Sequence, residues 1–136
     1  EYNRARVGLC LSAEEGSMYA STQYLLCGLP IVTTKSRGGR DLMFNPTDCI
    51  YVEDTPESVA LGVKEAISRN LNPADVRARV LEKMNEHRRK LIGIIQDYLD
   101  RRGGKVNFAE VFRRHFANKL LVVKPMEELK MFPARH

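Results

Sequence analysis

Short apolar runs and longer amphipathic stretches alternate along the first half of the chain. Residues 7–11, 31–34 and 49–52 are continuous runs dominated by aliphatic and β-branched side chains. Short runs without polar alternation are typical of strands that are buried on both faces of a parallel sheet. The pattern therefore predicts three buried, parallel strands.

The stretches that link these runs predict two helices and one polar loop. The first helix follows a turn at residues 15–17 and ends at Gly28, in the position of a C-cap glycine, with Pro30 just beyond it. The second begins at Thr55, an N-cap residue followed by proline, and shows helical apolar spacing over about 14 residues. Residues 35–41 form a loop that contains paired glycines.

The order strand, helix, strand, loop, strand, helix describes half of a doubly wound α/β domain. We predict an α/β fold in which residues 1–70 form a partial Rossmann-like parallel sheet of three strands. Residues 71–136 are predicted to be a helical C-terminal extension, with one long helix that opens at Asn72 and a second helix that is capped by Asn107. Residues 120–123 are either the apolar end of that second helix or a short strand.

Composition favours a soluble protein of the cytoplasm. The chain is 43% hydrophobic and 29% charged, and no apolar run approaches the roughly 20 residues of a membrane span. Its first residues do not have the pattern of a signal segment. They look like the end of a helix and do not begin with methionine, so we expect a fragment of a longer protein. The three cysteines are odd in number and lie in apolar runs, which favours buried thiols over disulfides or a zinc site.

Charge is divided unevenly between the two halves. Residues 1–68 carry six Lys/Arg against nine Asp/Glu, a net charge of −3, and residues 69–136 carry sixteen against eight, a net charge of +8. A basic half can meet nucleic acid, an anionic membrane or an acidic partner, and it can also be a solvated helix surface. Phenylalanines at 108, 112 and 116 have core spacing and do not suggest an exposed stacking platform, so we expect no nucleic acid. Solvated helix surface is the first explanation of the basic half, and peripheral contact with an anionic membrane is the second.

Polar and acidic residues cluster where the first strand turns into the first helix. Glu14 and Glu15 precede the helix start, and Gly16 leaves room for a ligand to approach the backbone. Open α/β sheets bind ligands at this corner, and a helix start suits a phosphate group. The plain alternative is that Glu14 and Glu15 only cap the helix and keep the surface soluble. Gln23 lies two turns beyond Glu15, and the loop of Gly38 and Gly39 should open at the same sheet edge.

This combination resembles the donor-binding C-terminal domain of GT-B fold retaining glycosyltransferases of the group 1, or glycogen-synthase-like, family. The family motif has two glutamates separated by seven residues, then a Cys-Gly-x-Pro-Val-Val-like run and a Gly-Gly loop. The corresponding residues here are Glu15, Gln23, the run at 27–34 and the glycines at 38 and 39. The match covers residues 1 to about 70.

The resemblance implies a role for each matching residue. Glu15, the expected catalytic residue, would hydrogen-bond a hydroxyl of the transferred sugar, and Gln23 would bind the ribose where the family has its second glutamate. Ser17 stands where the family usually has an aromatic residue. The expected donor-binding residues are Gly16, Ser17, Met18, Tyr19, Gln23, Gly38 and Gly39, of which Met18 and Tyr19 would offer backbone N–H groups to the diphosphate.

The resemblance also implies what lies elsewhere. The cations that neutralise the diphosphate and the N-terminal acceptor domain with its histidine would lie upstream of this chain, so the fragment alone would be inactive. No metal or cofactor is implied beyond the nucleotide sugar, and the transferred sugar would retain its configuration. Lys35, Arg37 and Arg40 are expected on a solvated loop face, and His115 is expected to pack on a helix stripe.

Two functions remain open from the sequence. In the first, the parent protein is a glycosyltransferase of the hexosyltransferase type that uses a nucleotide diphosphate sugar. In the second, the chain is a non-catalytic Rossmann-like interaction or assembly module with a degenerate donor motif. In either case the missing strands should leave a sheet edge unpaired, so we expect the isolated chain to form homo-oligomers.

Overall fold

The computed structural model of the chain describes residues 4–116. The chain divides into two compact units, Glu1–His87 and Arg88–His136. The first unit reaches beyond residue 70 because the long helix α3 (Pro73–Arg101) begins with Val76 and Val80, which are buried in the core of this unit. Residues 120–123, expected to be a helix end or a strand, lie outside the described residues.

A three-stranded parallel sheet forms the centre of the first unit. Its strands are β1 (Gly8–Cys10), β3 (Ile31–Thr33) and β5 (Cys49–Tyr51), in the order β1-β3-β5. The register pairs Leu9 with Val32 and Val32 with Ile50. The fold class predicted from the apolar runs is confirmed: the chain is α/β with a three-stranded parallel sheet.

The helices that connect the strands end and begin where the sequence predicts. Helix α1 (Tyr19–Leu26) ends in a Schellman motif, since the N–H of Gly28 donates to the carbonyl of Leu25 and the N–H of Leu29 to that of Tyr24. Gly28 has φ +79°, which glycine adopts without strain. Helix α2 (Pro56–Ser68) is capped by the Thr55 hydroxyl, which accepts a hydrogen bond from the N–H of Ser58.

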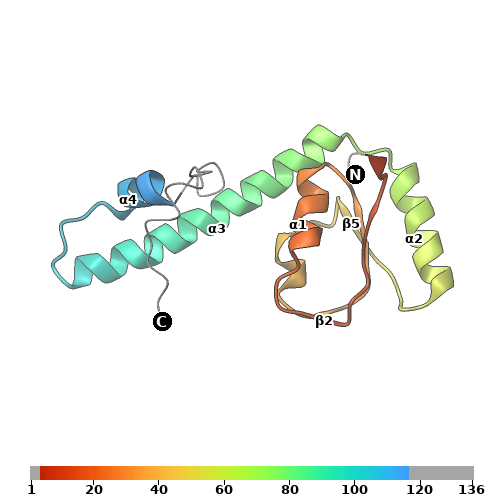
Figure 1. Ribbon diagram of the computed structural model, residues 1–136, viewed down its shortest axis with the longest axis horizontal. Coiled ribbons are helices and arrows are strands. Elements are labelled where there is room, and N and C mark those ends of the chain that lie inside the picture. The colour runs from red at the N-terminus through yellow and green to blue at the C-terminus, as the bar shows by residue number, and fades with distance from the viewer. Residues whose placement is uncertain (1–3, 117–136) are drawn as a thin grey trace, which may run out of the picture. The chain divides into compact units, whose positions relative to one another are not determined.

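Helices cover both faces of the sheet (Figure 1). On one face α1 and the start of α3 pack against β1, β3 and β5, and α2 packs on the other face. The first core contains Cys10, Leu25, Ile31, Phe44, Cys49, Val76 and Val80. The second contains Val32, Ile50 and Ala66. Two apolar layers around one sheet explain why its central strand carries no polar alternation.

Only β3 is buried throughout, and the expectation of burial on both faces is wrong for Leu9 of β1 and for Tyr51, the last residue of β5. Leu9 in β1 is 43% exposed and Tyr51 in β5 is 51% exposed, whereas all three residues of β3 are buried. β1 and β5 are the edges of the described sheet. Leu9 alternates with Cys10 and lies on the α2 face without being covered, whereas Tyr51 alternates with Ile50 and lies on the other face, beside Phe44. Among the three cysteines, Cys10 and Cys49 are buried free thiols as expected, and Cys27 is half-buried.

A buried ion pair fixes α3 to the loop that precedes β5. The carboxylate of Asp48 is 2% exposed and accepts hydrogen bonds from Arg79 Nε at 2.9 Å and Arg79 Nη2 at 2.5 Å. One turn further along α3, Lys83 Nζ donates to the carbonyl of Phe44 at 2.8 Å. Loss of one member of such a pair leaves a buried charge without compensation, so this contact strongly favours one docking of the helix start.

The second unit contains the remainder of α3 and helix α4 (Phe108–His115). α3 ends as α1 does, because Gly103, at φ +72°, donates to the carbonyl of Asp100, and Gly104 donates to that of Leu99. Asn107 caps α4 as predicted by accepting a hydrogen bond from the N–H of Glu110. His115 is exposed, so the expectation that it packs on a helix stripe is wrong.

We predict that the isolated chain self-associates through β1. Within the described residues β1 pairs on one side only, with β3, and it exposes 43% of Leu9, so a second strand can add to its free edge. Light scattering should give a mass that exceeds 15.5 kDa and rises with concentration. Leu9→Lys should return the chain to a monomer, since a charge on an edge strand opposes pairing.

The matched control is Leu61→Lys on α2, where the leucine is 65% exposed and lies away from any strand. This variant should associate as the parent chain does. A monomeric parent chain, or equal effects of the two substitutions, would contradict association through β1.

Candidate functional site

Two loops meet beyond the carboxyl ends of β1 and β3. Their residues form a small second sheet, in which β2 (Glu14–Glu15) runs parallel to β4 (Arg37–Gly38). Glu14 pairs with Arg37 and Glu15 with Gly38. The sequence predicted that the two loops would open at the same edge, and the structure brings them into direct backbone contact.

The two glycines of the second loop are required by this contact. A Cβ on Gly38 would lie 1.9 Å from the carbonyl oxygen of Glu15, and Gly38 also has φ +113°, which other residues rarely adopt. Gly39 donates its N–H to the carbonyl of Gly16 at 2.8 Å, and a Cβ on Gly39 would lie 2.4 Å from that oxygen. Gly38 and Gly39 therefore serve loop-to-loop packing.

Gly16 has a different environment. A Cβ placed on Gly16 would meet no atom within 4 Å, and the residue is exposed. Packing within the chain therefore does not require glycine at this position. The open space in front of Gly16 is available to a ligand.

A buried arginine links the loops to the main sheet. Arg40 is 2% exposed and begins the short 3₁₀ helix η2 (Arg40–Met43). Its guanidinium donates to the carbonyls of Cys10 at 3.1 Å and Ser12 at 2.6 Å, and also to that of Thr34. These carbonyls lie at or just beyond the ends of β1 and β3, so one side chain holds both strand ends in place.

The position of Arg40 corrects the sequence expectation. Arg40 was expected on a solvated loop face together with Lys35 and Arg37, and only the last two are exposed. Its charge is neutralised inside the fold, because Nε donates to Asp41 Oδ1 at 2.8 Å and the other donors meet carbonyl oxygens. The partners of Arg40 are up to 30 residues away along the chain, so no local pattern could have revealed them.

Asp41 extends this link to the third strand. Its second carboxylate oxygen, Oδ2, accepts a hydrogen bond from the Tyr51 hydroxyl at 2.9 Å. Partial burial raises the pKa of Tyr51 to about 12, and the hydrogen bond to Asp41 and the negative charge of that carboxylate add to the rise. Arg40 and Asp41 together therefore connect the carboxyl ends of all three strands of the main sheet.

The start of α1 lies next to this corner and has no side-chain cap. Met18 is the N-cap residue, it makes no side-chain capping hydrogen bond, and the first turn contains no acidic residue. The capping part of the plain alternative is therefore wrong, because Glu14 and Glu15 lie in β2 several residues earlier. The helix start retains the N–H groups that suit an anion.

The predicted site residues fall into two groups. Glu15, Gly16 and Gly38, with Glu14 and Arg37, line one open depression of about 670 Å³. The predicted residues that do not line it are Ser17, Met18, Tyr19, Gln23 and Gly39. Tyr19 is 84% exposed at the first position of α1 and Gln23 is exposed one turn further on. The depression and the helix start are joined by the short segment 16–18.

The charges that line the depression are largely solvated. Arg37 Nη2 forms an ion pair with Glu14 Oε1, and the two side chains are 85% and 65% exposed. Exposed pairs of this kind contribute about 0–1 kcal/mol to stability. This pair therefore does not hold the loops together, and a ligand can displace it at small cost.

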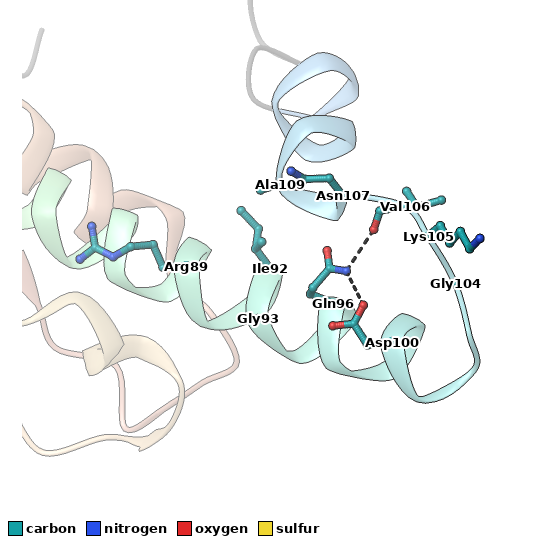
Figure 2. Close-up of a pocket in the computed structure, with 10 residues that line it drawn as sticks. All are labelled: Arg89, Ile92, Gly93, Gln96, Asp100, Gly104, Lys105, Val106, Asn107 and Ala109. Carbon is teal, nitrogen blue, oxygen red and sulfur yellow. Dashed lines mark hydrogen bonds between the residues drawn. The ribbon is translucent and has the colours of Figure 1, made fainter.

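A second hollow of about 750 Å³ lies in the other unit, between α3 and the start of α4 (Figure 2). Its central polar side chain is engaged within the unit: Gln96 Nε2 donates to Asp100 and to the carbonyl of Val106, and Gln96 Oε1 accepts from the N–H of Phe108. These bonds fasten the segment before α4 to α3. Both N–H donors of Gln96 and one lone pair of its oxygen are used in this way, so we regard this hollow as a product of helix packing.

Among residues 4–116, no group of three or more His, Cys, Asp or Glu side chains lies together as metal ligands would. Within the same range, no helix has both the length and the apolarity needed to cross a bilayer.

Comparison with known proteins gives one informative similarity. The chain matches no family model and no solved structure. It is 25% identical over 84 residues to the O-antigen biosynthesis protein RfbC of Myxococcus xanthus. The aligned part covers 62% of this chain and 7% of that protein. The chain therefore spans only a small part of the length of this relative.

We predict that alanine at Gly38 and alanine at Gly16 change the stability of the fold to different extents. Gly38→Ala should destabilise the fold by about 1–3 kcal/mol, since it combines a strained φ with a clash against the carbonyl of Glu15. Gly16→Ala, the matched control in open space, should change stability by less than about 0.5 kcal/mol. Urea unfolding followed by circular dichroism measures both, and equal midpoints would contradict the loop packing described.

We also predict a pH dependence that originates at Tyr51. The folded pKa of about 12 lies above the ordinary value near 10, so the neutral hydroxyl is favoured in the folded state. Its contribution to stability is complete below pH 10 and is lost as the pH rises through 12. Absorbance titration at 295 nm of the parent chain minus Tyr51→Phe should show a midpoint near pH 12. The same difference titration in urea, where the chain is unfolded, should show a midpoint near pH 10. Equal midpoints for the folded and the unfolded chain would contradict the contact with Asp41.

Proposed function

We propose that this chain is the donor-binding part of a glycosyltransferase that moves a sugar from a nucleotide diphosphate sugar to an acceptor. The observation that carries the proposal is the pairing of β2 with β4 beside the uncapped start of α1. This arrangement places a glutamate, an open glycine and free helix N–H groups at the carboxyl edge of a parallel sheet. The similarity to an O-antigen biosynthesis protein supports a role in sugar chemistry.

Each part of the corner suits one part of such a donor. Glu15 is half-buried and lines the depression, so its carboxylate is available to accept hydrogen bonds from sugar hydroxyls. The backbone N–H groups at Met18 and Tyr19 would bind the diphosphate, as helix starts commonly do. Gly16 and Ser17 would let the ligand approach the backbone. Gln23 would bind a ribose hydroxyl through its amide.

The chemical step requires the departing diphosphate to be stabilised. In the transfer, an acceptor oxygen bonds to the anomeric carbon and gives up its proton to the departing diphosphate, while the bond from that carbon to the diphosphate breaks. The helix N–H groups would stabilise the charge that develops on the diphosphate. The retained configuration, the acceptor domain and the phosphate-neutralising cations are proposed for the parent protein, so the chain alone would bind donor without transferring it.

The cations of this chain do not replace those proposed for the parent protein. Arg40 is buried and bonded to four oxygens, so Arg37, in its displaceable pair with Glu14, is the one cation that lines the depression among the described residues. A donor held here would therefore need further positive charge from elsewhere. The three free thiols support a reducing compartment such as the cytoplasm for the parent protein.

The second candidate is a non-catalytic interaction or assembly module. The observation that favours it is Gln23, which places a neutral amide where the resembling family has a carboxylate. The free edge of β1 is a further surface that such a module would use. Donor binding separates the two candidates, because only the first requires it.

We predict that the chain binds nucleotide diphosphate sugars and that Glu15→Ala weakens binding about tenfold or more. A hydrogen bond to a charged group is worth about 1.5–3 kcal/mol, and 1.4 kcal/mol is a tenfold change. Saturation-transfer NMR and calorimetry with UDP-, GDP- and ADP-sugars measure the affinity. Gln23→Glu tests whether the second carboxylate improves it.

The matched control is Glu14→Ala, which removes the neighbouring carboxylate of the same strand, where it pairs with Arg37. This variant should bind the donor at least as well as the parent chain, since it removes a negative charge from the depression and leaves Arg37 available to the diphosphate. Absence of binding to every nucleotide sugar would refute the donor site. Equal losses from Glu14→Ala and Glu15→Ala would refute the particular role of Glu15.

A further inference from the structure

An apolar stripe lies exposed on the second half of α3. Leu91, Ile94 and Tyr98 are spaced three and four residues apart, so they lie on one face of the helix. Their exposed fractions are 47%, 69% and 53%. A surface helix ordinarily buries such a stripe. The exposed face formed by these three residues is called the α3 stripe below.

Helix α4 does not occupy this face. The contacts of the segment leading to α4 are made by Gln96, which lies two residues from both Ile94 and Tyr98 and therefore on the opposite side of α3. Figure 2 shows that Gln96 and Asp100 point towards this segment and bond to one another. The α3 stripe thus remains uncovered by the described part of the second unit.

Cations surround the α3 stripe. Residues 88–116 contain eight Lys/Arg and three Asp/Glu, a net charge of +5. Lys90 and Arg101 lie along one border of the stripe and Arg102 along the other, by helical spacing. The guanidinium of Arg102 lies 4.7 Å from the centre of the Tyr98 ring. The surface therefore combines exposed aliphatic groups with flanking positive charge.

The charge and the shape select one occupant. A second copy of this chain would bring the same positive charge and be repelled. Nucleic acid would satisfy the cations but leave Leu91 and Ile94 in water. An acidic amphipathic helix would pair with the α3 stripe as in a coiled coil, but the stripe spans only residues 91–98, about one heptad, whereas coiled coils are marked by three to four heptads. An anionic lipid surface accommodates all three features, since it takes aliphatic side chains, tyrosine and cations at one flat boundary.

We propose that the α3 stripe docks onto an anionic lipid surface. Leu91 and Ile94 enter the boundary between headgroups and acyl chains, Tyr98 lies at headgroup level, and the flanking cations contact lipid phosphates. The helix lies in the plane of the interface. This inference is independent of the proposed donor site, which belongs to the other unit.

The experiment uses the full chain with vesicles of pure phosphatidylcholine and of phosphatidylcholine with phosphatidylglycerol. Co-sedimentation should show binding to the anionic vesicles alone, weakened by added salt. Leu91→Gln combined with Ile94→Gln should lower the partition coefficient at least about tenfold, since two apolar side chains leave the bilayer boundary. Leu61→Gln, on an equally exposed leucine of α2, should leave it unchanged.

A second readout does not depend on the loss of binding. The chain contains no tryptophan, so Ile94→Trp provides a single fluorescent probe on the α3 stripe. Its emission should shift to the blue with anionic vesicles and be quenched by brominated lipid, whereas that of Leu61→Trp should not change.

Four outcomes would overturn the proposal. The first is equal binding to neutral and anionic vesicles, and the second is undiminished binding by the doubly substituted chain at unchanged helix content. The third is an unshifted Ile94→Trp spectrum. The fourth is capture of an acidic amphipathic peptide or of RNA without any binding to vesicles, which would assign the surface to another class of partner.

Discussion

The first unit depends on the buried guanidinium of Arg40. Its donors meet carbonyls that follow β1 and β3, and Asp41 continues the connection to Tyr51 in β5. Parallel strands leave their last carbonyls unpaired at the carboxyl edge, and buried polar groups need partners. One planar group with five donors satisfies several of them together. The charge of Arg40 is thereby used for structure, so the corner gains its shape at the expense of a cation that could have met a phosphate.

The corner follows from this constraint. With the strand ends held, the segments after Ser12 and Thr34 leave the sheet side by side and pair as β2 and β4. The pairing is close enough that Gly38 and Gly39 tolerate no side chain, whereas Gly16 faces open space. Glycines that look alike in the sequence therefore have different purposes. Two of them serve the fold, and one leaves room beside Glu15 for a ligand.

Much of the fold could be predicted because its signals are local. The apolar runs gave the strands, and Gly28, Thr55 and Asn107 marked helix ends through chemistry confined to a few neighbouring residues. The role of Arg40 could not be predicted from the sequence, because its carbonyl partners are up to 30 residues away along the chain. Two-residue strands such as β2 have no periodicity to detect. The exposure of Leu9 depends on its place at the sheet edge, which a hydrophobic run does not encode. The sequence predicted that the two candidate loops open at the same edge, while the sorting of the candidate residues needed coordinates.

The pairing of β2 with β4 also determines how the corner can move. Its two segments are joined by backbone hydrogen bonds between Arg37 and Ala13 and between Gly39 and Gly16, and both are tied to the sheet through Arg40. Neither segment can leave its place without breaking the bonds of the other. Local opening of the two is therefore cooperative, and they form one dynamic unit. A contact made on either loop restricts the fluctuations of both, so the corner responds to a ligand as a whole.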